Sequence, residues 1–142
     1  MKGLVHIYEG TGKGKSTAGV GLTIRCAGNG FPVVYSQFLK DGTTGEMNIL
    51  RKIPNITVLV EEHHFGFSFL MTPEEKVEAK AAYTALFEKV KAAAVEQNAR
   101  LLVMDEMLDL CNAELIDTAM VVDFLKNRPE QLEVVMTGRN PK

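Results

Sequence analysis

Five short apolar runs, rich in β-branched residues, alternate with longer segments that have a helical pattern. The runs cover residues 4–8, 33–38, 56–60, 101–104 and 132–136. Their apolarity is continuous, which is typical of strands covered on both faces in a parallel sheet. We therefore predict a doubly wound α/β domain, with a mainly parallel sheet and helices on both faces. His6, inside the first run, is expected to be a core residue.

Three helices are predicted between these runs. The clearest begins at Thr72-Pro73-Glu74-Glu75, a capping box with proline at the first helical position, and extends to about residue 98. Its apolar stripe marks the face expected to pack on the sheet. The stripe consists of Ala79, Tyr83, Leu86, Val90 and Ala94. Further helices are predicted over residues 16–27 and about 117–127, and Pro129 stops the second of these.

Composition is that of a single soluble domain spanning residues 1–142. The net charge of −2 provides no broad electrostatic attraction to nucleic acid. Cys26 and Cys111 lie far apart and match no metal-binding spacing, so we expect two reduced thiols in the cytoplasm. No apolar run approaches the roughly 20 residues of a membrane span. We therefore expect neither a nucleic-acid partner nor a membrane partner.

The segment Gly10-Thr11-Gly12-Lys13-Gly14-Lys15-Ser16-Thr17 joins the first predicted strand to the first predicted helix. In that context loop N–H groups surround phosphate groups, and the helix N-terminus adds partial positive charge. Lys15 is expected to reach the terminal phosphates, and the Ser16 hydroxyl to bind Mg²⁺. Glu9 stands where the usual motif begins with glycine, so Gly10 supplies the turn one residue later. We predict a variant P-loop; the alternative is a glycine-rich hairpin with two exposed lysines.

A second motif, Leu101-Leu102-Val103-Met104-Asp105-Glu106, ends an apolar strand in two acids. Asp105 is predicted to bind Mg²⁺ directly or through water, on the same ion as Ser16. Buried strands often end in an acid, so the upstream glycine loop is what favours this interpretation. Glu106 would activate water in an ATPase and would only position groups in a transferase, and the residues leave both open.

Three aromatic residues, Phe65, Phe67 and Phe69, occupy alternate positions between the third predicted strand and the capped helix. In an extended segment all three rings point to one side. This favours an aromatic wall for a large, flat ligand. The alternative is a hydrophobic patch that packs under a loop.

An ordered set of short blocks resembles the P-loop type of ATP:corrinoid adenosyltransferase, also called cob(I)alamin adenosyltransferase. Besides the glycine loop without its first glycine, the blocks are Arg25 with Ala27-Gly28-Asn29-Gly30, Gln37-Phe38-Leu39-Lys40, Gly45-Glu46-Met47-Asn48, Gly66-Phe67-Ser68-Phe69, Asp105-Glu106, Asn127-Arg128-Pro129 and Thr137-Gly138-Arg139. Many unrelated NTPases share the glycine loop, whereas the ordered set is far more specific. The resemblance covers nearly the whole chain and implies a RecA-like P-loop NTPase fold.

The resemblance implies transfer of the 5′-deoxyadenosyl group of ATP to the cobalt of a reduced corrinoid, with release of triphosphate. It implies Lys13, Lys15 and Glu106 as catalytic residues, and Ser16 and Asp105 as ligands of Mg²⁺. The residues implied to contact ATP or the corrinoid are Gly10, Thr11, Gly12, Lys13, Gly14, Lys15, Ser16, Thr17, Arg25, Phe67, Phe69 and Arg139. Co(I) is a strong nucleophile, so the protein's tasks are positioning and stabilisation of the leaving triphosphate.

Family members place aromatic rings on the lower face of the corrinoid, where they displace the axial ligand and make Co(II) easier to reduce. Phe67 and Phe69 match these rings by position, although the second is often tryptophan in the family. The resemblance also implies a flavin or flavodoxin-type electron donor and a homodimer. Family members continue past the Thr-Gly-Arg block, so this domain is expected to be short at its C-terminus.

Two other functions are compatible with the residues. One is a RecA-like ATPase or small-molecule kinase, which would release ADP in place of triphosphate. The other is a protein that binds a nucleotide or a corrinoid without turnover. The identity of the products distinguishes all three functions.

Overall fold

The computed structural model describes residues 4–9, 15–38, 45–60 and 71–138. The elements follow in the order β1 (Val5–Glu9), α1 (Lys15–Gly28), β2 (Val33–Gln37), α2 (Gly45–Leu50), β3 (Ile56–Val60), α3 (Pro73–Glu96), β4 (Leu101–Asp105), α4 (Met107–Asn112), α5 (Thr118–Asn127) and β5 (Glu133–Gly138). None of the helices in these ranges is both long enough and apolar enough to cross a membrane.

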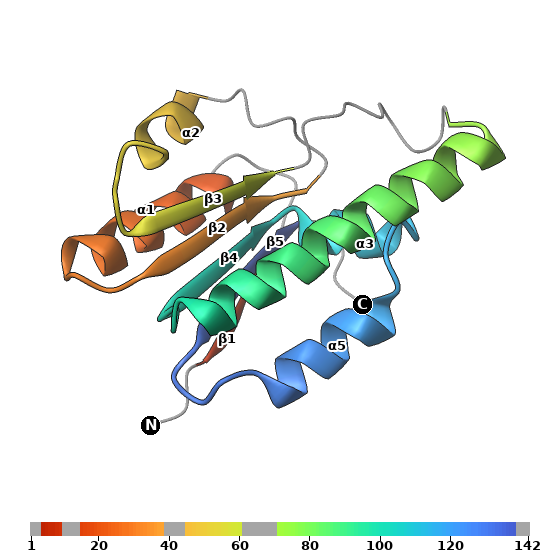
Figure 1. Cartoon of the computed structure of the whole chain (residues 1–142). Helices are drawn as coiled ribbons and strands as arrows, with labels where there is room; N and C mark the ends of the chain where they lie inside the picture. Colours follow the sequence, from red (N-terminus) through yellow and green to blue (C-terminus); the bar gives the residue numbers. More distant parts are fainter. Residues whose placement is uncertain (1–3, 10–14, 39–44, 61–70, 139–142) are drawn as a thin grey trace.

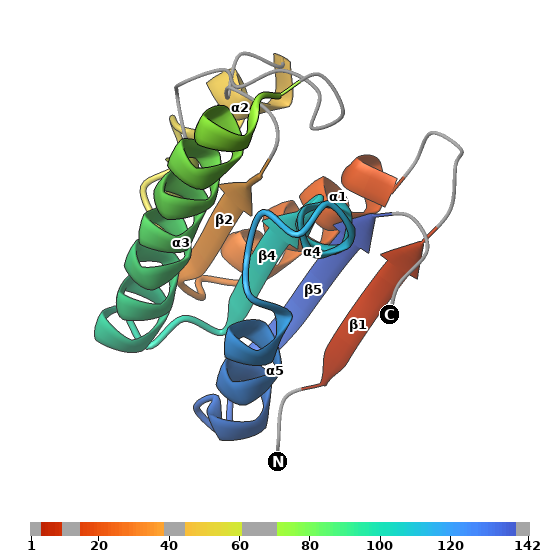
Figure 2. The same ribbon diagram turned by 90° about the vertical axis from the view of Figure 1, so that its right-hand side faces the viewer.

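The strands form one sheet in the order β1-β5-β4-β2-β3, and every neighbouring pair is parallel. Helices α3, α4 and α5 cover one face, and α1 and α2 cover the other (Figures 1 and 2). The predicted doubly wound α/β domain is therefore confirmed. Because the sheet is parallel, the carboxyl ends of all its strands meet at one edge, where ligands bind in such folds.

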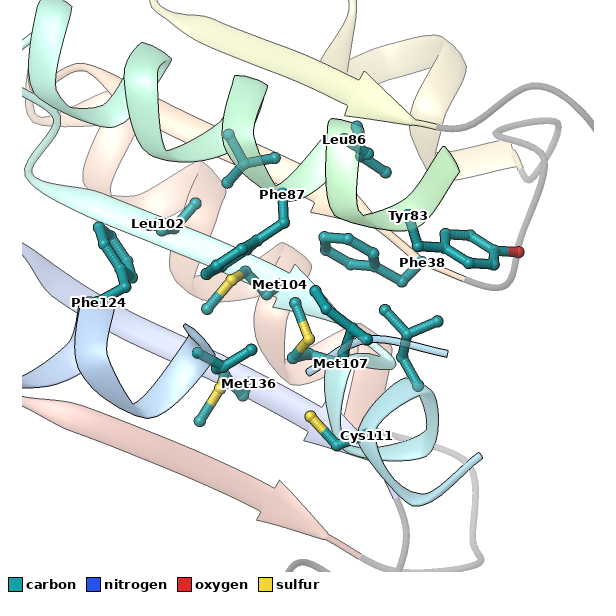
Figure 3. Close-up of a cluster of buried hydrophobic side chains, with 14 of the residues drawn as sticks. Phe38, Tyr83, Leu86, Phe87, Leu102, Met104, Met107, Cys111, Phe124 and Met136 are labelled. Atoms are coloured by element: carbon teal, nitrogen blue, oxygen red, sulfur yellow. The ribbon is translucent and has the colours of Figure 1, made fainter. Parts of the chain in front are cut away.

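The larger core lies between the sheet and helices α3 to α5. It combines aliphatic side chains with methionines and aromatic rings, and Figure 3 shows Phe87 of α3 and Phe124 of α5 approaching across it. Their rings meet edge to face with centroids 5.9 Å apart, a favourable geometry for aromatic pairs. The whole predicted stripe of α3 is buried, with Phe87 added to it. A smaller core lies between the sheet and helices α1 and α2.

Helix α3 begins and ends in standard capping geometry. The Thr72 hydroxyl accepts a hydrogen bond from Glu75 N–H at 3.1 Å, and the Glu75 carboxylate accepts one from Thr72 N–H at 3.2 Å. This is the predicted capping box. At the other end Asn98 adopts a left-handed conformation with a φ of 51°, and Ala99 N–H donates to Ala94 O at 3.0 Å. That closing turn stops the helix at Glu96, slightly before the predicted end.

Two short helices, α2 and α4, were not predicted. Each has only six residues, too few for a 3.6-residue period to be recognised. In α4 the positions Met107, Leu108, Leu110 and Cys111 are all buried. A helix that is apolar on most sides shows no amphipathic stripe, so its pattern merges with that of the preceding strand.

Strand β1 departs from the predicted burial. It lies at one edge of the sheet, beside β5. Ile7 in the strand is 47% exposed, and Leu4 directly before the strand is 62% exposed. The prediction that His6 is a core residue is wrong. Its side chain is 33% exposed, and Nε2 lies 2.7 Å from Glu133 Oε1 of β5. An edge strand is covered on fewer sides than a central one, and a short apolar run does not reveal which position it will take.

Candidate functional site

Three neighbouring strands carry polar side chains in register at the carboxyl edge of the sheet. Gln37 of β2 pairs with Asp105 of β4. Met104 pairs with Met136 of β5, so Thr137 follows beside Asp105. All three side chains are almost fully buried, although they lie at or next to the carboxyl ends of their strands. Because side chains alternate along a strand, they share the sheet face that packs on α1.

Asp105 is held from both sides at this edge. The Thr137 hydroxyl donates a hydrogen bond to Asp105 Oδ1 at 2.6 Å. Gln37 Nε2 approaches Asp105 Oδ2 at 3.4 Å, the long limit for a hydrogen bond. The Thr137 hydroxyl also accepts a hydrogen bond from Glu106 N–H at 2.8 Å. The contact from β5 is therefore the tighter of the two.

The turn after β4 is packed against the end of β5. Glu106 adopts a left-handed conformation with a φ of 65°. Gly138 has a φ of 150°, and a Cβ atom there would lie 2.5 Å from Leu108 Cβ and 2.9 Å from Asp109 N. No side chain fits between β5 and the start of α4, so the edge that carries Asp105 and Thr137 is closely packed.

Two buried polar atoms beside Asp105 have no hydrogen-bond partner within the described residues. They are the Tyr35 hydroxyl and Gln37 Oε1, two residues apart on the same face of β2. Burial, and next the nearby Asp105 carboxylate, raise the pKa of Tyr35 far above its ordinary value, so the phenol stays protonated at neutral pH. The nearby Gln37 side chain lowers this pKa in part, although it makes no hydrogen bond to the phenol oxygen. Unpaired buried polar atoms of this kind suit a bound water or a polar ligand atom.

The predicted strand–loop–helix order of the P-loop is confirmed in its two flanking elements. Strand β1 ends at Glu9, and α1 begins at Lys15, so Lys15, Ser16 and Thr17 form the first helical turn. Figure 2 shows this end of α1 at the same edge as the ends of β4 and β5. A Cβ atom on Gly19 would lie 3.3 Å from Val103 Cγ1, so α1 packs closely on β4.

The structure brings together part of the predicted site. Asp105, Glu106 and the backbone of Lys15, Ser16 and Thr17 lie at one edge of the sheet. Eight predicted residues lie outside the described ranges: Gly10, Thr11, Gly12, Lys13, Gly14, Phe67, Phe69 and Arg139. No cluster of three or more His, Cys, Asp or Glu side chains occurs within the ranges that are described.

Arg25 is not brought to this edge. It lies in the last turn of α1, ten residues after Lys15. At 1.5 Å per residue, about 15 Å of helix separates the two positions. Its predicted contact with ATP or the corrinoid stays a prediction.

Sequence reasoning did not select Thr137 or Gln37 as site residues. Thr137 directly follows an apolar run of the sequence, as Asp105 does, and Gln37 is a polar residue within such a run. These signals were present, but they indicate only that a strand ends in a polar residue. The partnership with Asp105 depends on which strands are neighbours.

Comparison with known proteins decides the family. A sequence model described as ATP:corrinoid adenosyltransferase BtuR/CobO/CobP matches residues 1–142. The chain belongs to this family. The predicted resemblance and the predicted P-loop NTPase-like α/β fold are thereby confirmed.

Several curated relatives are named corrinoid adenosyltransferases. A corrinoid adenosyltransferase of Sinorhizobium sp is 33% identical over 143 residues, which cover 99% of this chain and 66% of the relative. Those of Escherichia coli K12 and Salmonella typhimurium are each 29% identical, over 97% of this chain and 68% of the relative. The chain thus spans about two thirds of the length of these relatives. Their names agree with the predicted transferase function.

Proposed function

We propose that this chain transfers the 5′-deoxyadenosyl group of ATP to the cobalt of a reduced corrinoid and releases triphosphate. One observation carries the proposal: a buried Asp105, held by Thr137, lies at the sheet edge where α1 begins. An acid at the carboxyl edge of a parallel sheet, beside a helix N-terminus, is typical of a Mg-nucleotide site. The family match supports a corrinoid as the acceptor of the adenosyl group. The reaction forms a cobalt–carbon bond at C5′ and breaks the C5′–O bond, whose electron pair leaves with triphosphate.

The triphosphate would lie at the N-terminus of α1. Lys15, Ser16 and Thr17 open this helix, whose first turn provides N–H groups and partial positive charge. Lys13, Lys15 and the amides of residues 10–14 would stabilise negative charge on the leaving triphosphate. Because Co(I) needs no general base to attack carbon, Glu106 would position groups and would not activate water.

Mg²⁺ suits the residues at this edge. Asp105 supplies a buried carboxylate, and Gln37 Oε1 beside it is an acceptor without a partner in the described part of the chain. Hard cations prefer oxygen ligands and keep several bound waters, which such an acceptor can orient. Ser16 and Asp105 would hold the ion. When bound, it would offset phosphate charge.

The corrinoid would lie against Phe67 and Phe69. These residues fall between β3 and α3, in the connection that leaves the carboxyl end of β3, the same edge as Asp105. Arg25 and Arg139 are proposed to contact ATP or the corrinoid. The proposal extends to a flavin or flavodoxin-type donor that reduces Co(II), to a homodimer and to a cytoplasmic location.

The test is incubation with Mg-ATP and chemically reduced cobalamin, followed by visible spectroscopy and phosphate analysis. We expect adenosylcobalamin and triphosphate in equal amounts. Lys15→Ala is the control, because loss of this cation should abolish turnover without removing core packing. ADP formed without a corrinoid would indicate an ATPase or kinase. Binding without either product would indicate a protein that does not catalyse the reaction.

A further inference from the structure

Thr137 uses its hydroxyl twice, and the two partners determine the direction of both hydrogen bonds. Glu106 N–H can only donate, so the Thr137 oxygen accepts from it at 2.8 Å. The single hydroxyl proton then points to Asp105 Oδ1, 2.6 Å away. The result is a directed chain from a backbone N–H, through a hydroxyl, to a carboxylate. Hydrogen bonds in such a chain polarise and strengthen one another.

The surroundings make this arrangement specific. Thr137 is 1% exposed and Asp105 is fully buried, so bulk water does not compete for either group. A β-branched side chain in a strand has few χ1 rotamers, which limits where the hydroxyl can point. Thr137 engages Oδ1 on the β5 side, while Oδ2 lies toward Gln37 on the β2 side. The carboxylate is thereby oriented across the sheet edge before any ligand arrives.

We propose that Thr137 is a positioning residue for the metal–nucleotide site, which presets the Asp105 carboxylate and couples it to the Glu106 backbone. The inference rests on the proposed function to the extent that Asp105 is taken as a ligand of the metal. Partners that orient a metal ligand change metal affinity or activity by about 10- to 100-fold when they are removed. Thr137 does not need to touch the nucleotide or the metal to have this effect.

Other buried hydroxyls in the chain show what a purely structural role looks like. Ser36 donates to Val103 O at 2.7 Å, and Thr23 of α1 donates to Gly19 O at 2.8 Å. Both acceptors are backbone carbonyls, and Thr23 is fully buried like Asp105. Thr23→Val therefore removes a buried threonine hydroxyl of similar packing without altering a carboxylate. It is the matched control for Thr137→Val.

The experiment dialyses the protein to equilibrium against increasing Mn²⁺ with saturating ATP and no corrinoid. Because ATP itself binds Mn²⁺, protein-bound metal is taken as the excess of Mn²⁺ on the protein side, measured by electron paramagnetic resonance after acid release. Wild type, Thr137→Val, Thr137→Ser and Thr23→Val are compared, each with a thermal midpoint. We expect Thr137→Val to raise the Mn²⁺ concentration for half saturation about tenfold or more. Thr137→Ser, which keeps the hydroxyl, should restore binding to near the wild-type value. Thr23→Val should lower the thermal midpoint alone.

Wild-type Mn²⁺ affinity in Thr137→Val, or an equal loss in Thr23→Val, would overturn the inference. So would a wild-type protein that binds no Mn²⁺ with ATP. If Thr137→Val does not fold, Thr137→Cys replaces it, because a thiol keeps the size but donates weakly; unchanged affinity in that variant overturns the inference as well.

The outcome is separable from that of the proposed function because the titration contains no corrinoid. Thr137-dependent Mn²⁺ binding in a protein that makes no adenosylcobalamin supports the inference and refutes the function. If the protein forms adenosylcobalamin but its Mn²⁺ affinity does not depend on Thr137, the function is supported and the inference is refuted.

Discussion

At the scale of single residues, Asp105 and Glu106 both adopt states that an isolated strand end would not favour. Asp105 is fully buried, and burial of a carboxylate is unfavourable unless hydrogen bonds replace the lost water. Thr137 supplies such a bond at 2.6 Å. Glu106 has a φ of 65°, a conformation that costs a non-glycine residue about 1 kcal/mol or more. Both departures lie at the candidate site, where strained or buried groups are expected to serve function.

The aromatic pair provides a prediction at this scale. We expect Phe67→Ala and Phe69→Ala to reduce adenosylation severely when Co(II) must be reduced on the protein. The loss should be much smaller when free Co(I) is supplied, because the difficult reduction is then bypassed. ATP affinity should be nearly unchanged. Rates in both assays, ATP affinity and thermal midpoints are measured on the same preparations; parallel losses in all of them would show that the rings are only core.

At the scale of elements, close packing between the end of β5 and the start of α4 lies directly beside the candidate site. The last residues of β5 place Thr137 against Asp105 and Gly138 against the backbone of α4. Helix α4 has only six residues and is joined to β4 through Glu106 alone, so it has little freedom to move away from β5. The close packing at Gly138 therefore helps to fix the position of Asp105, although glycine has no functional side chain.

Gly138→Ala tests this dependence. Its Cβ would lie 2.5 Å from Leu108 Cβ and 2.9 Å from Asp109 N, in addition to an unfavourable φ of 150°. We expect a loss of about 2 kcal/mol or more in the free energy of unfolding, measured with urea. Gly21→Ala is the control, since that helical position has nothing within 4 Å. It should stabilise the protein by about 0.5–1 kcal/mol. Equal effects of the two substitutions would contradict the packing argument.

At the scale of the whole molecule, the strand order determines which functional side chains lie close together. Strand β5 lies between β1, which precedes the glycine loop, and β4, which carries Asp105. This places Thr137 between the two halves of the nucleotide site. It also leaves β1 at the edge of the sheet, with Leu4 and Ile7 substantially exposed.

An exposed apolar edge strand favours association with other strands. We expect Leu4→Lys to reduce the fraction of large species at high protein concentration, as measured by light scattering, because a charge at an edge opposes strand pairing. Val77→Lys is the control: Val77 is 71% exposed, but it lies on α3. Both variants should change the free energy of unfolding by less than about 0.5 kcal/mol. Equal reductions in both would show that general solubility, and not the edge, is responsible.

Elements with a clear local pattern, namely the five strands and the three longer helices, could be predicted from the amino-acid sequence, and so could the resemblance to the family. Continuous apolar runs located all five strands of the sheet, because burial on both faces leaves that pattern. The capping box located the start of α3, because capping is local chemistry. Neighbouring residues in the sequence were also enough to recognise Asp105 at the end of β4. The same holds for the strand and the helix on either side of the glycine loop. Two helices of six residues were missed because each has fewer than two turns, too few for a 3.6-residue period to be recognised.

The order of the strands in the sheet becomes clear only in the folded molecule. Asp105 meets Thr137 from 32 residues away and Gln37 from 68 residues away. The fold also places β1 at the edge of the sheet and His6 outside the core. The physical reason is that a local pattern reports the period and burial of its own segment. Strand order is selected by packing across the whole sheet, so contacts between strand ends appear only when every element is in place.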